Sequence, residues 1–346
     1  MSTRAVHFVG SYPAGSPDEA MRAMLDGAGA RMRTLPNGET DRYELYVLPI
    51  IDDLVRQGAL EVKQVGRWSP GWRRTIHRVP PGKTLTGDMM DLGYLREAEQ
   101  ALPAFTALRR EYELPGLTMQ VGMPTDLSLT FVAVGAAGVR SHRKAFADAS
   151  LRDIPTIRES TGDNVVFQLE ATAELVLMAL AQPLHRQVDA RFGLAAGIAA
   201  MAAAAPAGTR FGVHMCLGSL NNKAATGLRS AAPLVDLANS IARQWPSGRT
   251  LEYVHGPFAA GAIPPSTKPE FYEPLSRLAL PRGTAFYAGF VHDVPTEAEQ
   301  RHTLHMIEER LGRPVDGVAS PCGLGRRPRD IADAMVARAD ILAGAD

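Results

Sequence analysis

Cysteine is almost absent from this sequence of 346 residues, in which Cys216 and Cys322 are the only two. Two cysteines cannot form the dense disulfide framework of a small secreted protein, and a reducing compartment is the ordinary setting for such a chain. The segment from Met1 to His7 also lacks the apolar core of a signal peptide. We therefore expect a cytoplasmic protein.

The sequence has no excess of charge of either sign and no long apolar run. The 37 Lys and Arg residues balance the 37 Asp and Glu residues, which argues against a nucleic-acid or membrane-surface partner held by bulk electrostatics. The longest apolar run, from Leu194 to Pro206, is too short to span a bilayer. We expect no nucleic-acid partner and no membrane association.

Two common nucleotide-binding motifs are also missing. No strand is followed by GxGxxG before a helix, and no GxxxxGK[ST] occurs, so dinucleotide and P-loop functions lack support. No internal repeat or low-complexity linker marks a domain boundary. We therefore expect one domain over residues 1–346.

The sequence does contain eight short apolar segments that alternate with helical patterns. Expected strands are 5–9, 31–35, 117–121, 164–170, 210–216, 249–254, 284–291 and 316–320. Expected helices are 16–29, 43–57, 91–112, 135–150, 187–204, 230–243, 268–279, 296–312 and 328–343. Such alternation is typical of βαβ units with a parallel sheet. Eight units predict an α/β fold of the (β/α)8 TIM-barrel type, which takes about 250 residues plus insertions; an open doubly wound sheet is the alternative.

Residues 60 to 90 fit neither the helical nor the strand period. They contain Trp68, Trp72 and a Pro-Pro-Gly turn. Long segments of this kind usually have a function or are disordered. We expect an extended loop that acts as a lid, with simple packing by the two tryptophans as the alternative.

Polar side chains occur at almost every predicted strand end. They are Ser11, Glu39, Asp126, Glu170, His214, Cys216, Glu252, His292 and Cys322. In a TIM barrel these ends form the active site. Imidazole and thiolate together favour zinc, although a lone cysteine is more often a small core residue.

Two of these residues allow more than one interpretation. Glu252 lies within an apolar strand, where a carboxylate needs either a metal or a cationic partner, so a salt bridge is the alternative to a metal site. His292, next to Asp293, could be a general acid or base, a fourth metal ligand or a structural residue. His255, three residues after Glu252, is a further candidate ligand.

These motifs resemble those of the C-terminal catalytic barrel of cobalamin-independent methionine synthase and its shorter single-barrel relatives. The resemblance runs in order over most of the chain. Its most specific part is His214-x-Cys216 together with Pro321-Cys-Gly-Leu324, which match the zinc motifs of that family. The resemblance implies a Zn²⁺ site with four ligands: His214, Cys216, Glu252 and Cys322.

Weaker motifs of the same family imply a substrate site. Val9-Gly-Ser-Tyr-Pro13 resembles an element whose serine holds the amino-acid substrate, and Asn37-Gly-Glu39 with Arg42 resembles one whose glutamate binds homocysteine. Phe167-Gln-Leu-Glu170 lies where the family contacts the substrate amine. The expected substrate-binding residues are Ser11, Glu39, Arg42, Asp126 and Glu170.

The segment Val291-His292 resembles a strand-end histidine that acts as a proton donor in the family. The resemblance therefore implies that His292 protonates the leaving group and that Asp293 orients it. Arg327 falls where the family often has an arginine. The tryptophan that stacks on folate has no counterpart after Gly122-Met-Pro-Thr125, so the zinc and thiol half of the chemistry is the better supported half.

The activity implied by this resemblance is that of a zinc-dependent methyltransferase of methionine biosynthesis. It would activate a homocysteine-like thiol as a zinc thiolate for attack on a methyl donor such as 5-methyltetrahydrofolate. The expected partners are these two small molecules, with either a partner protein or a homo-oligomer.

Three other functions stay open at this stage. One is a zinc-dependent thiol or amino-acid transferase or lyase of specialised metabolism with a non-folate donor. Another is a metal-free enzyme similar to uroporphyrinogen decarboxylase, in which the two cysteines are incidental. The last is a zinc-stabilised thiol- or pterin-binding protein, which the wide spacing of the candidate ligands disfavours.

Overall fold

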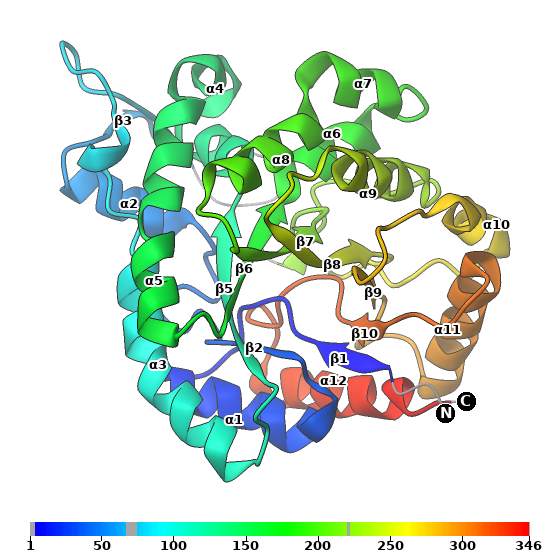
Figure 1. Cartoon of the computed structure of the whole chain (residues 1–346). Helices are drawn as coiled ribbons and strands as arrows, with labels where there is room; N and C mark the ends of the chain where they lie inside the picture. Colours follow the sequence, from blue (N-terminus) through cyan, green and yellow to red (C-terminus); the bar gives the residue numbers. More distant parts are fainter. Residues whose placement is uncertain (1–3, 67–74, 220–221, 346) are drawn as a thin grey trace.

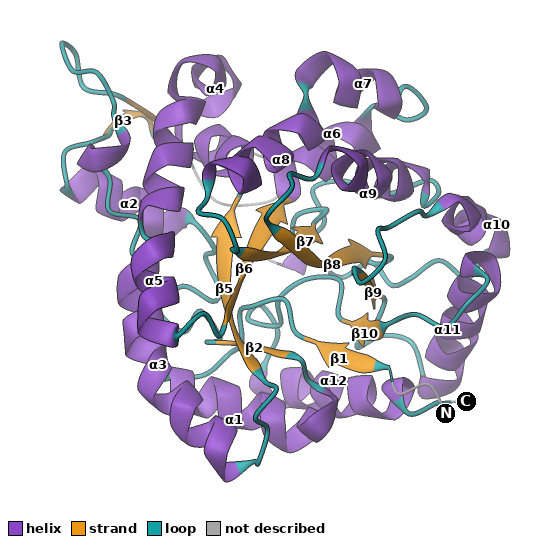
Figure 2. Ribbon diagram, in the orientation of Figure 1, coloured by secondary structure: helices purple, strands orange, loops and turns teal. Residues whose placement is uncertain are grey.

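Eight parallel strands form a nearly closed barrel surrounded by helices in this computed structural model (Figures 1 and 2). The structure describes residues 4–66, 75–219 and 222–345. Neighbouring strands follow the order β1-β10-β9-β8-β7-β6-β5-β2. A parallel bridge between Val6 and Met32 joins the two ends of this order. The predicted TIM barrel is thus confirmed, and the open sheet is wrong.

The strands of the barrel are short, as the sequence predicts. They are β1 (Ala5–His7), β2 (Thr34–Pro36), β5 (Thr118–Pro124), β6 (Val165–Ala171), β7 (Arg210–Met215), β8 (Thr250–Pro257), β9 (Ala285–Gly289) and β10 (Gly317–Ala319). All eight predicted strands are present, but β8 runs three residues beyond its predicted end and β9 ends two residues before it.

Helices cover the outside of the barrel. They are α1 (Pro17–Ala28), α2 (Leu48–Arg56), α3 (Tyr94–Glu111), α4 (Asp126–Arg152), α5 (Ile154–Thr161), α6 (Thr172–Leu180), α7 (His185–Phe192), α8 (Leu194–Ala204), α9 (Ala232–Gln244), α10 (Pro269–Tyr272), α11 (Glu297–Leu311) and α12 (Arg329–Ala343). None of the described helices is long and apolar enough to cross a membrane. The sequence analysis missed α5 and α6; α6 follows β6 without a loop, so no turn signal separates them.

Several helix ends follow directly from local sequence. The Ser16 side chain caps α1 by accepting from the Glu19 backbone N–H at 3.2 Å, and Pro17 occupies the first turn. Thr296 and Glu299 form a capping box at the start of α11. Gly312 ends α11 in the left-handed region with φ of 73°.

The segment between α2 and α3 contains its own small sheet. Strands β3 (Glu61–Gln64) and β4 (Ile76–Arg78) pair antiparallel and lie beside α4 (Figure 1). His77 of β4 is buried, and its Nδ1 donates to the Ala133 carbonyl at 3.1 Å. Residues 60–90 therefore contain regular structure, which the sequence did not predict. Trp68 and Trp72 lie outside the described residues, and the role of this segment as a lid stays a prediction.

A buried polar network fills the barrel interior below the mouth. The amide nitrogens of Gln120 and Gln168 donate to the Val9 carbonyl at 2.8 and 2.6 Å, and Tyr253 donates to Gln168 at 3.1 Å. His7 stacks on Tyr287 with ring centroids 4.8 Å apart. Because unpaired polar groups are costly to bury, these bonds fix the chain at Val9, which leads directly into the loop of Ser11.

The barrel interior leaves no room for a side chain at Gly212. A Cβ there would lie 2.0 Å from the ring of Tyr253. We predict that Gly212→Ala lowers the free energy of unfolding by about 1–3 kcal/mol through overpacking, measured by urea denaturation. Gly116→Ala is the matched control, since a Cβ at Gly116 meets nothing within 4 Å. Equal stability of the two variants would contradict this account of the interior.

Candidate functional site

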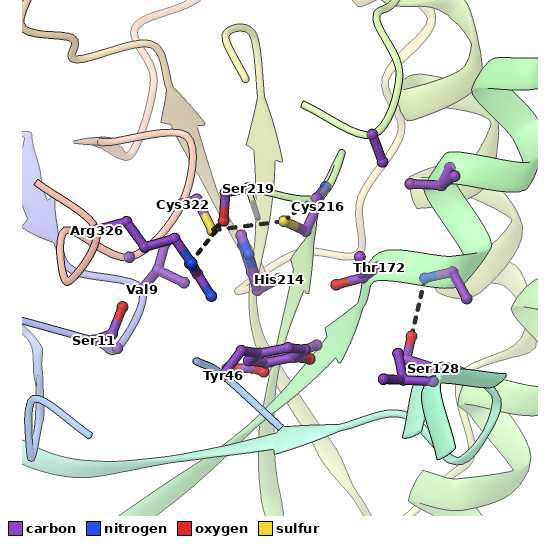
Figure 3. A pocket seen from close by; sticks show the side chains of 18 of the residues that line it. Val9, Ser11, Tyr46, Ser128, Thr172, His214, Cys216, Ser219, Cys322 and Arg326 are labelled. Atoms are coloured by element: carbon purple, nitrogen blue, oxygen red, sulfur yellow. Dashed lines mark hydrogen bonds between the residues drawn. The ribbon is translucent and has the colours of Figure 1, made fainter. Parts of the chain in front are cut away.

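A cavity of about 150 Å³ opens at the carboxyl ends of the strands (Figure 3). Its walls come from the ends of five barrel strands and from the first turns of α4 and α6. The lining residues are Val9, Gly10, Ser11, Glu39, Tyr46, Ser128, Phe131, Val132, Glu170, Thr172, Ala173, Val176, His214, Cys216, Gly218, Ser219, Ala225, Cys322, Gly323 and Arg326. This is the position at which TIM-barrel enzymes carry their active sites.

The two cysteines meet at one side of this cavity (Figure 3). Cys216 follows β7 and Cys322 follows β10, yet their sulfur atoms lie 3.6 Å apart. The Ser219 hydroxyl is 3.0 Å from the Cys322 sulfur, and the Gly218 N–H donates to the Cys216 sulfur at 3.3 Å. The structure thus brings together two residues that are far apart in the sequence.

The two thiols have opposite acidities. The hydrogen bond with Cys216, followed by the nearby His214, holds the pKa of Cys322 well below its usual range. The same sulfur contact, together with burial, raises the pKa of Cys216 well above its usual range. One thiolate shared between two sulfur atoms is the charge that attracts a soft cation.

His214 completes the cluster. One ligand atom each from His214, Cys216 and Cys322 lie within 4.8 Å of one another. Two sulfur atoms bound at about 2.3 Å to one tetrahedral zinc lie about 3.8 Å apart, close to the spacing of the two cysteines. Donor types and spacing therefore fit a zinc ion with a further position left open.

His255 lies directly behind His214. The two residues face each other on the neighbouring strands β7 and β8, with their Nδ1 atoms 2.7 Å apart. The His255 Nε2 lies 3.0 Å from the Ser320 carbonyl oxygen. Burial, and then the neighbouring His214, lower the pKa of His255 well below its usual range, so its ring is neutral near pH 7.

The structure does not bring Glu252 to this cluster, which corrects its prediction as a ligand. Glu252 lies near the start of β8 and lines a different hollow, with Arg33 and Asp316, at the amino ends of the strands. Its Oε1 accepts from Arg210 at 2.6 Å. The salt bridge, considered above as the alternative, is what satisfies this carboxylate.

Two buried carboxylates occupy another part of the cavity wall. Glu39 and Glu170 are 6% and 4% exposed, and Glu39 Oε1 and Glu170 Oε2 have no hydrogen-bond partner within the described part of the chain. Arg42 forms an ion pair with Glu39 at 3.4 Å but donates its two hydrogen bonds to Glu97. The pair therefore keeps unsatisfied acceptor atoms at the cavity.

Burial raises the pKa of both carboxyl groups. For Glu170 burial is the largest cause and the charge of Glu39 the next, and together they raise its pKa to about 8. For Glu39 burial outweighs the opposing charge of Arg42. Burial raises the pKa of Tyr46 well above its usual range. The charge of the nearby Glu170 is the second cause of this rise. A cation placed here would ionise both carboxyl groups and pair with them.

Two glycines make room for these carboxylates. A Cβ at Gly10 would lie 2.9 Å from Glu39 Oε1, and one at Gly122 would lie 2.8 Å from Glu170 Oε1 and 3.0 Å from Glu39 Oε1. Both glycines lie on or next to barrel strands. The absence of side chains at these positions lets two acidic groups share one corner of the barrel.

Ser11 and Arg326 also line the cavity (Figure 3). The Ser11 hydroxyl accepts from the Gly325 N–H at 3.3 Å, which joins the first and last loops of the barrel. Arg326 donates to the Ser219 hydroxyl at 2.8 Å, while its buried Nε has no hydrogen-bond partner among the described residues. This guanidinium is the cation that lines the cavity.

Apart from Ser128 and Thr172, the side of the cavity toward α4 and α6 is apolar. It is formed by Phe131, Val132, Ala173 and Val176, together with Ala225 from the loop after β7. Apolar walls with a few placed polar groups are typical of small-molecule sites. The cavity thus offers a charged end and an apolar end on either side of the thiols.

Two of the predicted substrate-binding residues, Arg42 and Asp126, do not line the cavity. Arg42 lies behind Glu39, and Asp126 starts α4 as the bidentate partner of Arg143 at 2.6 and 2.9 Å. These contacts assign both residues to the support of the wall. Their contact with a substrate stays a prediction.

His292 also lies outside the cavity lining, with Asp293. Its Nε2 donates to the Gly261 carbonyl at 2.9 Å, and its Nδ1 is 3.0 Å from Asp293. Burial lowers the pKa of His292. Asp293 in turn pairs with Arg327 at 2.5 Å. Because both ring nitrogens are engaged with the protein, this placement does not support the predicted proton donor.

Sequence reasoning missed the contributions of Tyr46, Ser219 and Arg326. Ser219 lies three residues after Cys216 and Arg326 four residues after Cys322, so proximity to the cysteines was the available signal. Tyr46 reaches the cavity from the turn before α2, where its φ of 56° is unusual for a tyrosine. No sequence pattern predicts that conformation.

Comparisons with known proteins agree with this fold. No model of a protein family matches the chain, and no curated protein is detectably similar in sequence. Among solved structures, the chain is similar to a B12-independent methionine synthase from Shewanella sp. W3-18-1 in complex with selenomethionine. The TM-score is 0.62 at 12% identity, over 99% of this chain and 97% of that one. At this identity the likeness establishes a shared barrel fold.

Proposed function

We propose that this chain is a zinc-dependent methyltransferase whose acceptor is the sulfur atom of a small amino-acid-like thiol. The observation that carries the proposal is the meeting of His214, Cys216 and Cys322 in one cavity with two buried carboxylates. Zinc bound there would lower the pKa of a coordinated substrate thiol and keep it in the nucleophilic thiolate form.

Other residues around the cavity could bind the ammonium and acidic groups of such a substrate. Glu39 and Glu170 have unsatisfied oxygens that would pair with an ammonium group, and their glycine-made corner fits a small cation. Arg326 and Ser11 would bind the acidic group of the same molecule. An amino acid with a side-chain thiol, such as homocysteine, satisfies all of these groups at once.

The reaction moves one methyl group from a donor to the substrate sulfur. The bond between carbon and sulfur forms as the bond between the methyl carbon and its donor breaks. The thiol proton is lost when the thiol binds, and the departing donor takes up a proton. His292 lies outside the cavity lining, so that second proton would come from water.

The methyl donor distinguishes two versions of this function. A donor such as 5-methyltetrahydrofolate is the first version, because the fold is shared with a B12-independent methionine synthase. The second is a non-folate donor, favoured by the apolar wall of Phe131, Val132 and Val176. An aliphatic or aryl group would bury more apolar area against that wall than a polar pterin would.

We predict about one zinc per chain in protein purified without added metal. Cys322→Ser should lose most of that zinc on dialysis against a chelator, because it removes the more acidic thiol of the cluster. Glu252→Gln should keep it, because this carboxylate pairs with Arg210. Elemental analysis of the three proteins tests both statements.

The outcome separates the alternatives clearly. Wild-type protein that is folded but contains no zinc would refute the proposed function and favour a metal-free enzyme. Zinc loss in Glu252→Gln equal to that in Cys322→Ser would show that the carboxylate is a ligand after all.

We predict that zinc-loaded wild type methylates homocysteine when given a suitable donor. The assay offers methyl-folate and, in parallel, simple aryl and alkyl methyl donors, and follows methionine by mass spectrometry. Glu170→Gln should raise the KM for homocysteine about tenfold or more, since one charged partner of the ammonium is lost.

A control acceptor without the amino group, 3-mercaptopropionate, should respond much less to this substitution. An equal effect of Glu170→Gln on both acceptors would contradict the placement of the ammonium group. Absence of methylation with every donor and thiol would refute the methyltransferase.

The raised pKa of Glu170 predicts a pH-dependent stability. Below its unfolded pKa of about 4.3 the carboxyl group is protonated in both states. Between that value and about 8 only the folded state holds the proton, so stability is lost as pH rises through this window. The loss is at most about 1.4 kcal/mol per pH unit for one proton.

In Glu170→Gln, without metal or substrate, this decline should be shallower than in wild type when urea unfolding is measured from pH 5 to 8. Glu159→Gln, at an exposed position on α5, is the matched control and should keep the wild-type slope. Parallel curves for wild type and Glu170→Gln would contradict the assignment.

A further inference from the structure

We propose that His255 is a positioning residue that fixes the tautomer of His214, leaving the lone pair of the His214 Nε2 free to bind a metal. This inference rests on the proposed zinc site. It assigns His255 a role behind the ligands, in place of the ligand role considered from the sequence.

The proton positions follow from one backbone atom. The Ser320 carbonyl oxygen can only accept, so the His255 Nε2, 3.0 Å away, carries the hydrogen. A neutral ring with hydrogen on Nε2 has its lone pair on Nδ1. The His214 Nδ1, 2.7 Å from that lone pair, must then donate. The remaining nitrogen of His214, its Nε2, keeps a lone pair.

Burial removes the competing arrangements. His214 is 2% exposed and His255 is fully buried, so water is not at hand to replace either bond. If both Nδ1 atoms carried lone pairs, two acceptors would face each other at 2.7 Å, and both would be buried without a hydrogen bond. The tautomer is therefore set by the protein before any metal arrives.

The same bonds connect the two ends of the proposed metal site. Ser320 lies two residues before Cys322, and its hydroxyl donates to the Cys322 carbonyl at 2.7 Å. The loop that presents the Cys322 sulfur thus also presents the carbonyl that orients His255. His255 in turn orients His214 on the neighbouring strand. A shift of this loop would disturb both ligands together.

The geometry also separates His255 from the ligands themselves. Its Nδ1 contacts His214, and its Nε2 contacts the Ser320 carbonyl. Within the described part of the chain, the three ligand atoms that lie within 4.8 Å of one another come from His214, Cys216 and Cys322, not from His255. Partners that orient a ligating histidine typically change metal affinity by 10–100-fold when they are removed.

The test begins with the wild-type protein without metal. Long-range ¹H–¹⁵N NMR on histidine-labelled protein should show hydrogen on Nδ1 of His214 and on Nε2 of His255. This measurement needs no substitution in the pair, and His214→Gln serves only to assign the signals. Hydrogen on Nε2 of His214 would overturn the proposal.

The second measurement is zinc affinity by competition with a chromophoric chelator. His255→Phe keeps a flat ring but cannot accept a hydrogen bond, and His255→Asn keeps an acceptor at a similar reach. We expect zinc binding to weaken 10–100-fold in His255→Phe, with partial rescue in His255→Asn and no change in His302→Gln, an exposed control on α11.

Each contrary result leads to a different conclusion. Wild-type zinc affinity in a folded His255→Phe would overturn the positioning role and leave the zinc site standing. A metal-bound ¹⁵N shift on His255 in the zinc-loaded protein would overturn it too, by making His255 a ligand. Absence of zinc binding in wild type would instead refute the proposed function, while the NMR result alone would still decide the tautomer.

Discussion

The contact between the Cys216 and Cys322 sulfur atoms spans the mouth of the barrel, and the candidate site depends on it. The two cysteines follow β7 and β10, which are separated in the sheet by β8 and β9. A sheet that curves into a barrel lets the side chains that follow these strands approach until their sulfur atoms are 3.6 Å apart. Barrel closure therefore brings the candidate metal ligands together, and the polar interior bonds to the Val9 carbonyl hold the chain that leads into the loop of Ser11.

Burial of charge explains why the cavity has its mixed character. Each acidic or thiol group at the mouth is either partnered by the protein or left with its acidity shifted. Arg42 donates its two hydrogen bonds to Glu97 and only forms an ion pair with Glu39, so burial still raises the pKa of both Glu39 and Glu170. A substrate cation would add the missing positive charge and lower the pKa of both carboxyl groups. Binding of the cation would therefore be coupled to ionisation of Glu39 and Glu170.

Much of the fold and part of the site could be predicted from sequence. The alternation of strands and helices predicted the barrel, and a cysteine at a strand end predicted where two ligands meet. Glu252 was misplaced because β8 continues to Pro257, so His255 lies nearer the mouth. His292 was misplaced because its ring nitrogens contact the Gly261 carbonyl and Asp293 and its side chain does not line the cavity. A one-dimensional pattern does not reveal how far a strand extends, and that extent decides which side chain reaches the mouth.

The glycines at positions 10 and 122 have a consequence for the history of this sequence. Because each leaves space for a carboxylate, a side chain at either position would force a glutamate carboxylate to move. Conversely, loss of an acidic group would free its glycine to change. The four positions therefore form a linked set in which substitutions must follow an order. Related barrels that lack one glutamate are expected to have changed at the facing glycine, so that covariation would trace which of them keep the acidic pair.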